Sequence, residues 1–448
     1  MRSCINRKRN IRTGPGIDNP LLNAYDKERI SFDEETFASV SSFTLFRIMD
    51  DKAEDHVMKK SRNQIALSAI MSVAFIWFTT HFGGGFASGA QLYSYFGKYG
   101  GWCLLLPVLA MAYDALFFGY ALHFARKHEV YDYRSYNNVF YGKYAPVFSN
   151  LFEVIYLVTM CLAPAVAFAT GGATLKAVTG LSYPVCTIII GLFIFLVAIF
   201  GSKLVRKVAS VLSIAIIIGL LIVYIPNIVT GADRISAAVS GMSQSGISFG
   251  SALYSAFLYG TFQLINIAVF VQHAETFSEP KEAKTSMGVG FIINSLMMVI
   301  VALGLLTICN EPDIAQQSVP TIFMVQKGVG ASFMLPLVSV LIILGAVSTA
   351  VNMVAAMVRR VAVCIMTDEE REKEEKTGKP VMKTIVIALV CCLIDFGIAQ
   401  FGLLTLVQKA YSFLAYLEIP VILIPYIIHM IVTRFDTKGG KNHEAGKL

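Results

Sequence analysis

The stretch HFGGGFASG, residues 81–89, lies well inside the first long apolar segment of this 448-residue chain. Each glycine in a helix interior costs about 1 kcal/mol relative to alanine, so this density of glycine predicts a break in the helix. A break at membrane depth frees backbone N–H and C=O groups, which protein, water, an ion or a substrate must satisfy. Close helix packing through small residues is the other interpretation of such a run. The density of glycine favours the break.

The composition of the whole chain predicts an all-α, polytopic membrane protein. It is 55% hydrophobic and 15% charged, with a mean hydropathy of +0.62, whereas soluble domains carry roughly 25% charged residues. The apolar residues gather in runs long enough to cross a hydrocarbon core of about 30 Å. The eight cysteines form no CxxC pair, which predicts free thiols. Ten segments are predicted, at residues 64–97, 100–124, 146–171, 183–201, 205–229, 250–273, 286–309, 333–363, 382–400 and 403–432.

The distribution of charge predicts the orientation. The net charge of +7 comes largely from Lys and Arg in alternate loops, such as residues 126–143 and 359–383, which fits the positive-inside rule and argues against nucleic-acid binding. Both termini are therefore predicted to be cytoplasmic in a multi-pass protein of the cell membrane. Residues 1–63 show no apolar core of a signal peptide and are predicted to be a disordered cytosolic region, and residues 433–448 a cytosolic tail. The outer region 310–332 is too short in apolar residues to span, and predicts a re-entrant or surface hairpin.

The predicted break would create two kinds of ligand. The half-helix ending near residues 79–82 would present carbonyl groups that suit a cation, and the half-helix beginning near residues 87–89 would present N–H groups that suit a carboxylate. Ser348 and Thr349, midway along segment eight, place two hydroxyl groups at membrane depth. Such hydroxyls usually bond to a carbonyl of their own helix. Beside a row of free carbonyls, they would complete an oxygen cage for sodium.

Segment six has a polar centre. Gly260 is accompanied there by Tyr259, Thr261, Gln263 and Asn266, and we predict a second interruption at this glycine. In a five-plus-five inverted repeat, segment six is the partner of segment one.

Six ionisable residues fall within predicted spans, and such residues usually face a bundle interior or a cavity: His81, Asp114, Glu153, Asp395, Lys409 and Glu418. The last of these, with Glu153 and Lys409, could lie near segment ends. Asp114 and Asp395 are deeper, so each is either a proton-binding carboxylate or a structural hydrogen-bonding group.

The sequence contains no HExxH, Walker or GxSxG motif, so no enzyme is predicted, and no resident cofactor. The string GGGFASGAQ, residues 83–91, together with the ten-segment layout, resembles the YkvI-type family of bacterial membrane proteins, whose first helix carries a GAGFASGQE-like motif. That family is similar to the amino acid–polyamine–organocation superfamily, which has the leucine-transporter fold. The resemblance covers residues 64–432 and implies two inverted five-helix repeats, about 64–229 and 250–432, with helices one and six broken.

The resemblance also implies site residues. A sodium ion would lie between the carbonyls of Thr79 and Phe82 and the hydroxyls of Ser348 and Thr349, and a substrate carboxylate would meet the N–H groups of Gly84 and Gly85. The full set of expected substrate-binding residues is Gly83, Gly84, Gly85, Ser88, Gly89, Tyr156, Tyr259, Gly260, Thr261 and Gln263, Tyr156 being the lone aromatic that could either gate the site or belong to the core. Two departures from the motif, Ala90-Gln91 in place of Gln-Glu and His81 beside the expected ion site, leave sodium and protons open as coupling ions, with His81, Asp114 and Asp395 as the candidate proton carriers.

These features predict a secondary transporter that moves a small organic solute, an amino acid or related zwitterion, with Na⁺ or H⁺ by alternating access. The alternative is a sensor or scaffold on the same fold that transports nothing, with residues 1–60 and the charged stretch 366–380 as docking sites for unknown protein partners.

Overall fold

The computed structural model describes residues 64–241, 248–377 and 379–436. The chain divides into two compact units, residues 1–63 and 64–448, and all described residues belong to the second unit. The predictions made for residues 1–63 and for the tail beyond residue 436 lie outside the described residues. Within them every regular element is helical, which confirms the all-α class.

Long apolar helices dominate the described part. Nine of them are long and apolar enough to cross a membrane, and the count becomes ten if the pair 214–230 and 232–240, bent by 71°, forms one span. The uninterrupted long helices are Gln64–His81, α4 (Leu106–His128), α6 (Ala145–Thr179), α7 (Tyr183–Leu196), α8 (Ser202–Thr230), α12 (Pro280–Leu306), α14 (Ala331–Ile365) and α16 (Met382–Ala399). A multi-pass membrane protein is therefore confirmed, and all ten predicted segments coincide with helical structure.

Two further spans are composite. Segment six consists of α10 (Phe249–Gln263), η5 (Leu264–Asn266), α11 (Ile267–Phe270) and η6 (Val271–Thr276). Segment ten consists of α17 (Leu403–Thr405), η8 (Leu406–Ala410), α18 (Tyr411–Glu418), η9 (Ile419–Leu423) and α19 (Ile424–Val432). Short elements connect the spans: η1 (Gly97–Leu104), α5 (Tyr133–Tyr141), η2 (Gly142–Tyr144), η3 (Val197–Gly201), α9 (Ala232–Ser240), η7 (Ile314–Gln316), α13 (Pro320–Lys327) and α15 (Asp368–Thr377).

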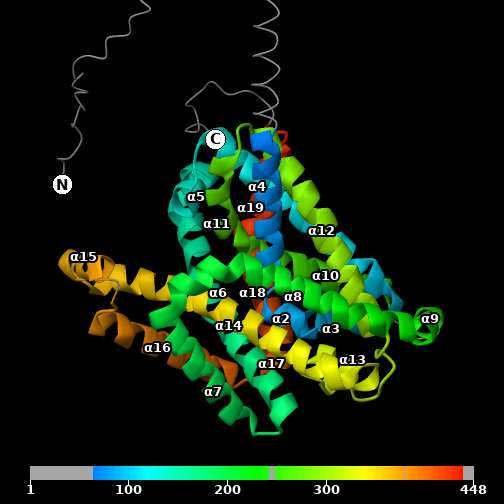
Figure 1. Ribbon diagram of the computed structural model, residues 1–448. Coiled ribbons are helices and arrows are strands. Elements are labelled where there is room, and N and C mark those ends of the chain that lie inside the picture. The colour runs from blue at the N-terminus through cyan, green and yellow to red at the C-terminus, as the bar shows by residue number, and fades with distance from the viewer. Residues whose placement is uncertain (1–63, 242–247, 378, 437–448) are drawn as a thin grey trace, which may run out of the picture. The chain divides into compact units, whose positions relative to one another are not determined.

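The first membrane segment is broken where the glycine run predicts. Its first helix ends at His81, and a single helical turn, α2 (Gly84–Ala87), follows. Gly89 then adopts φ +77°, a left-handed conformation that glycine tolerates best, before α3 (Ala90–Tyr95) begins. The two short helices lie in the middle of the bundle, beside α14 and α10 (Figure 1). The break therefore sits where helices from both halves of the chain meet.

Segment six departs from α-helical geometry, but not at Gly260, where we predicted the interruption. The α-helix continues through Gly260 to Gln263, and a 3₁₀ turn follows at Leu264–Asn266. Gly260 serves helix packing instead, because a Cβ atom there would lie 2.7 Å from the ring of Tyr113 on α4. The predicted position was wrong because a single glycine can serve close contact as well as a break.

The region 310–332, predicted to be a re-entrant or surface hairpin, packs on the break through α13. Its helix α13 is too short to span a membrane. The amide of Thr321 at the start of α13 donates to the carbonyl of Ser88, and the Thr321 hydroxyl donates to the carbonyl of Ala87, at 3.0 and 2.9 Å. These two bonds satisfy carbonyl groups that the interrupted helix leaves free. We refer to this contact as the Thr321 latch.

Candidate functional site

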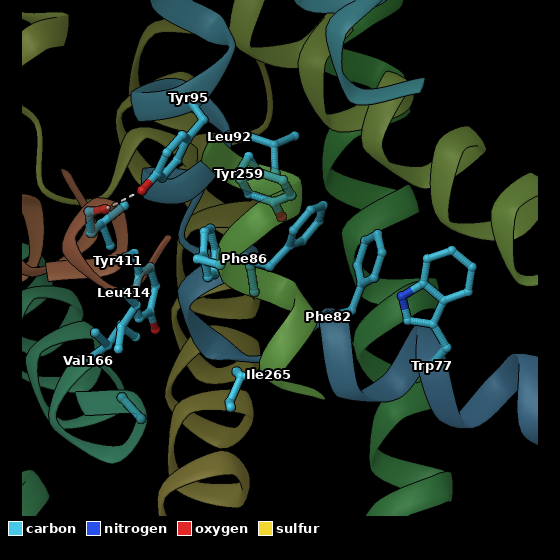
Figure 2. Packing of buried hydrophobic residues seen from close by; sticks show 14 of the residues in the cluster. Trp77, Phe82, Phe86, Leu92, Tyr95, Val166, Tyr259, Ile265, Tyr411 and Leu414 are labelled. Carbon is cyan, nitrogen blue, oxygen red and sulfur yellow. Dashed lines mark hydrogen bonds between the residues drawn. The ribbon is translucent and has the colours of Figure 1, made fainter. Parts of the chain in front are cut away.

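A cavity of about 100 Å³ lies beside the break. Its walls come from segment one, α6, the α10–η5 junction, α14 and α18, so both halves of the chain contribute. The lining residues are Thr80, His81, Gly83, Gly85, Phe86, Gln91, Thr159, Ala163, Val166, Ala167, Phe262, Gln263, Ile265, Asn266, Thr349, Met353, Tyr411 and Leu414. Figure 2 shows part of this region, with Phe82 and Phe86 of segment one, Tyr259 and Ile265 of segment six, and Tyr411 on α18 around the break.

Glycine makes the backbone of the break accessible to the cavity. A Cβ atom on Gly83 would lie 2.9 Å from the hydroxyl oxygen of Thr349, so only glycine allows α14 to approach this closely. Within the described part of the chain, no backbone carbonyl accepts a hydrogen bond from the amide of Gly83 or Gly85. The Thr349 hydroxyl donates to the carbonyl of Gly345 at 3.0 Å, which leaves its oxygen able to accept. The break thus presents both donors and an acceptor.

The remaining polar groups of the lining are neutral amides, hydroxyls and one imidazole. Asn266 donates to the side-chain oxygen of Gln263 at 2.9 Å, which holds two amides at the 3₁₀ turn. Gln91 lies over the break, because its amide nitrogen is 3.1 Å from the Cβ position of Gly85. No Asp, Glu, Lys or Arg is among the residues that line this cavity. In the described ranges, no group of three or more His, Cys, Asp and Glu residues could hold a metal ion.

His81 connects the end of the first helix to two other segments. Its Nε2 lies 2.6 Å from the hydroxyl of Tyr259 on α10, and its Nδ1 lies 3.1 Å from Oδ1 of Asn294 on α12. The Asn294 amide nitrogen donates to the carbonyl of Gly290, which fixes Oδ1 as the atom facing His81. Nδ1 therefore donates to Asn294, and in a neutral imidazole Nε2 accepts from the Tyr259 hydroxyl.

Replacing His81 by Phe should destabilise the protein. The hydroxyl of Tyr259 and Oδ1 of Asn294 would both lose their partner in a buried position, at about 1–3 kcal/mol for each group. Adding Tyr259→Phe should recover part of the loss, because one unpaired group disappears. Thermal unfolding of the purified protein in detergent measures both steps. An unchanged melting temperature in His81→Phe would contradict the proposed bonds.

Five residues predicted for the site do line the cavity: His81, Gly83, Gly85, Gln263 and Thr349. Gly84 begins α2 within the break. Tyr259 is not part of the lining, but its hydroxyl forms a hydrogen bond with His81, which is.

Several residues predicted for the site lie elsewhere. Ser88 connects α2 to α3, since its hydroxyl donates to the carbonyl of Gly85 and accepts from the amide of Ala90. Gly89 packs against the Thr321 latch. Thr261 turns toward α4, where its hydroxyl lies 3.2 Å from that of Tyr113. None of these three residues is part of the cavity lining.

The predicted sodium cage stays a prediction, and of its two hydroxyl-bearing residues only Thr349 lines the cavity. Adjacent residues on a helix point about 100° apart, and Thr349 takes the direction of the break while half-buried Ser348 is not part of the lining. The predicted backbone ligands, the carbonyls of Thr79 and Phe82, stay a prediction. Thr80, rather than Thr79, lines the cavity.

Tyr156 belongs to another cluster. Its ring lies beside that of Tyr133 on α5 and below the guanidinium group of Arg360 on α14. Arg360 forms an ion pair with Glu153, one turn before Tyr156 on α6. The face of α6 that lines the cavity begins one turn later, at Thr159. Tyr156 is therefore a packing residue of the α5–α6–α14 junction in this structure.

Both deep carboxylates are buried away from the cavity. Asp114 lies on α4 against Gly260 of α10, and Asp395 lies on α16. Neither side chain is accessible to solvent, and neither has a hydrogen-bond partner within the described ranges.

The sequence reasoning missed several lining residues. Gln91, Thr159 and Tyr411 are single polar residues in apolar segments, and each comes from a different segment. Asn266 was named in the polar centre of segment six but was not predicted as a site residue. Its position six residues after Gly260, among other polar residues, was the signal that could have identified it.

No family model matches the chain, and no curated protein matches it. Among solved structures, a manganese transporter of Eremococcus coleocola, in complex with an aromatic bis-isothiourea compound, is 15% identical, with a TM-score of 0.46 over 83% of this chain and 95% of that one. Mhp1, a nucleobase-cation-symport-1 family transporter with bromovinylhydantoin bound, is 12% identical, with a TM-score of 0.48 over 82% of this chain and 78% of that one. Both similarities are distant, and neither transfers a substrate or ion to this chain. The resemblance to the YkvI-type family stays a prediction.

Proposed function

We propose that this chain is a secondary active transporter for a small organic solute. The observation that carries the proposal is the cavity beside a broken membrane helix, walled by segments from both halves of the chain. Broken helices expose backbone groups at membrane depth without exposing them to lipid, and transporters use such groups to bind solute. Alternating access then follows if a bundle that includes segments one and six rocks against the rest of the helices, among them α6 and α14.

The lining favours an amino acid or a related zwitterion. The N–H groups of Gly83 and Gly85 suit a carboxylate, and the oxygens of Thr349 and Gln263 suit an ammonium group. The cavity volume of about 100 Å³ restricts the solute to a small one. The lack of carboxylates in the lining disfavours a divalent cation as cargo, because such ions prefer several oxygen or nitrogen ligands that include charged groups.

Uptake into proteoliposomes tests the function. The full-length protein is reconstituted, and accumulation of each of a panel of radiolabelled small amino acids is measured under an imposed sodium or proton gradient. We expect at least one solute to accumulate above its outside concentration. If no solute does so under either gradient, the transport proposal fails.

Thr349 and Ser348 give a sharper test of the cation cage. Thr349→Ala should weaken the apparent affinity for solute or cation about fivefold, which corresponds to one hydrogen bond of about 1 kcal/mol, whereas Ser348→Ala should have little effect. The measurement is the concentration dependence of uptake, with sodium replaced by potassium in a parallel series. If both substitutions weaken the affinity equally, both hydroxyls bind the cation, as the predicted cage requires.

The orientation and the rival function remain proposals of the same kind. The loop cations favour cytoplasmic termini in the cell membrane. Deleting residues 1–60 separates a transporter from a sensor or scaffold, because a transporter should keep solute uptake after the deletion. Loss of a protein partner with no uptake in either form would favour the scaffold.

A further inference from the structure

Two fully buried carboxyl groups, on α4 and α18, contact segment six. Asp114 on α4 and Glu418 at the end of α18 each have a relative exposure of 0%. Neither oxygen of Asp114 and only one oxygen of Glu418 has a hydrogen-bond partner within the described residues. No ion pair of the described part includes either residue. Glu418 was predicted as a residue that could lie near a segment end, and the structure places it in the core.

Both groups contact segment six close to its irregular turn. Oδ1 of Asp114 lies 3.4 Å from the Cβ position of Gly260, so the missing side chain of that glycine allows the carboxyl group to approach α10. Oε2 of Glu418 accepts a hydrogen bond from the amide of Ile265, at 3.1 Å, inside the 3₁₀ turn. Ile265 itself lines the central cavity. Glu418 is therefore one residue removed from the cavity.

Across the part of the chain that the structure describes, no cation pairs with either carboxyl group. Tyr113 on α4 packs at the same point as Asp114, against the Cβ position of Gly260, and Tyr259 precedes Gly260 in the chain. A carboxylate buried without a partner costs several kcal/mol, and two of them in one apolar region repel each other. Binding a proton removes the charge with no further ligand, whereas a metal ion needs a larger set of donors than this pair offers.

We propose that Asp114 and Glu418 together form a proton-binding site, and that proton binding at Glu418 controls the hydrogen bond to the Ile265 amide and so the shape of segment six at the cavity. A carboxylate accepts this bond more strongly than a neutral carboxyl group does. Loading forms one O–H bond with a proton taken from water on one side of the membrane. Release breaks that O–H bond and returns the proton to water on the other side.

Infrared spectroscopy of the full-length protein in liposomes tests proton binding without any knowledge of the solute. A protonated carboxylic acid has a C=O stretch that disappears on ionisation. We expect a protonated band at neutral pH that decreases on alkaline titration, and that loses a component in Asp114→Asn or Glu418→Gln. Asp395→Asn is the matched control, a buried carboxyl group on another helix, whose loss should leave the component of the pair unchanged. Titration with sodium at fixed pH should not change the band.

Two outcomes would overturn the inference. If the wild-type band lacks any component that depends on Asp114 or Glu418, the pair is ionised and binds no proton. If sodium addition removes that component, the pair binds a metal cation instead. Glu418→Gln keeps an oxygen for the Ile265 amide, so loss of the fold is not expected, and elution as a single species in size-exclusion chromatography verifies this.

The coupling role rests on the proposed transport function and has its own measurement. In proteoliposomes with a proton gradient, Glu418→Gln should still exchange solute across the membrane but should no longer concentrate it. Gradient-driven accumulation that persists in Glu418→Gln refutes the coupling role while leaving transport intact. Absence of uptake in the wild-type protein refutes transport, and the infrared result then stands by itself.

Discussion

Replacing Gly89 by Ala should lower the free energy of unfolding by about 2–4 kcal/mol. Alanine at φ +77° costs about 1–2 kcal/mol, since its Cβ approaches the backbone in this left-handed region. The new Cβ would also lie 2.8 Å from the hydroxyl oxygen and 3.2 Å from the amide nitrogen of Thr321, and such overpacking typically costs 1–3 kcal/mol. Because Thr321 bonds to Ala87 and Ser88, it cannot move without breaking the latch.

Gly180 provides a matched control for the effect of φ alone. It has nearly the same backbone conformation as Gly89, with φ 74° and ψ 0°, but no atom from another part of the structure lies within 4 Å of its Cβ position. Gly180→Ala should therefore cost only about 1–2 kcal/mol. Thermal unfolding in detergent should rank the wild type first, Gly180→Ala second and Gly89→Ala last. Equal losses at the two glycines would mean that the latch adds nothing to the stability of the break.

The sequence predicts those features of this molecule that are determined by residues close together in the chain. Spans and their order follow from local hydrophobicity, and the break at residues 81–89 follows from glycines that are adjacent in the chain. Each signal lies within one segment, and the helix must satisfy its own backbone in lipid whatever surrounds it. The single Gly260 did not distinguish a helix break from close packing against α4, because glycine suits both.

The composition of the cavity wall depends on rotation of each helix about its axis, which tertiary packing decides. Thr349 and Ser348 are neighbours in sequence, yet only Thr349 lines the cavity. The buried position of Glu418 depends on α18 packing against α10. A hydropathy pattern places residues along a span but does not orient a helix that is apolar on all sides.

The largest functional effect is expected from filling the cavity. Ala163 on α6 lines it, one residue before Pro164, which lacks the amide that would bond to the carbonyl of Met160. Ala163→Phe would place an aromatic ring in a space of about 100 Å³, so little room would remain for solute. We expect uptake to fall to the level of empty liposomes, while the melting temperature stays close to that of the wild type because an existing void is filled.

Val154→Phe is the matched control, since Val154 lies on the same helix with 57% of its surface exposed toward the surroundings of the bundle. It adds an aromatic ring where nothing is displaced, and uptake should remain at the wild-type level. Wild-type uptake by Ala163→Phe would show that solute does not pass through the cavity beside the break. Loss of uptake in both variants would instead point to a general effect of added bulk on α6, so the contrast between the two assigns the effect to the cavity.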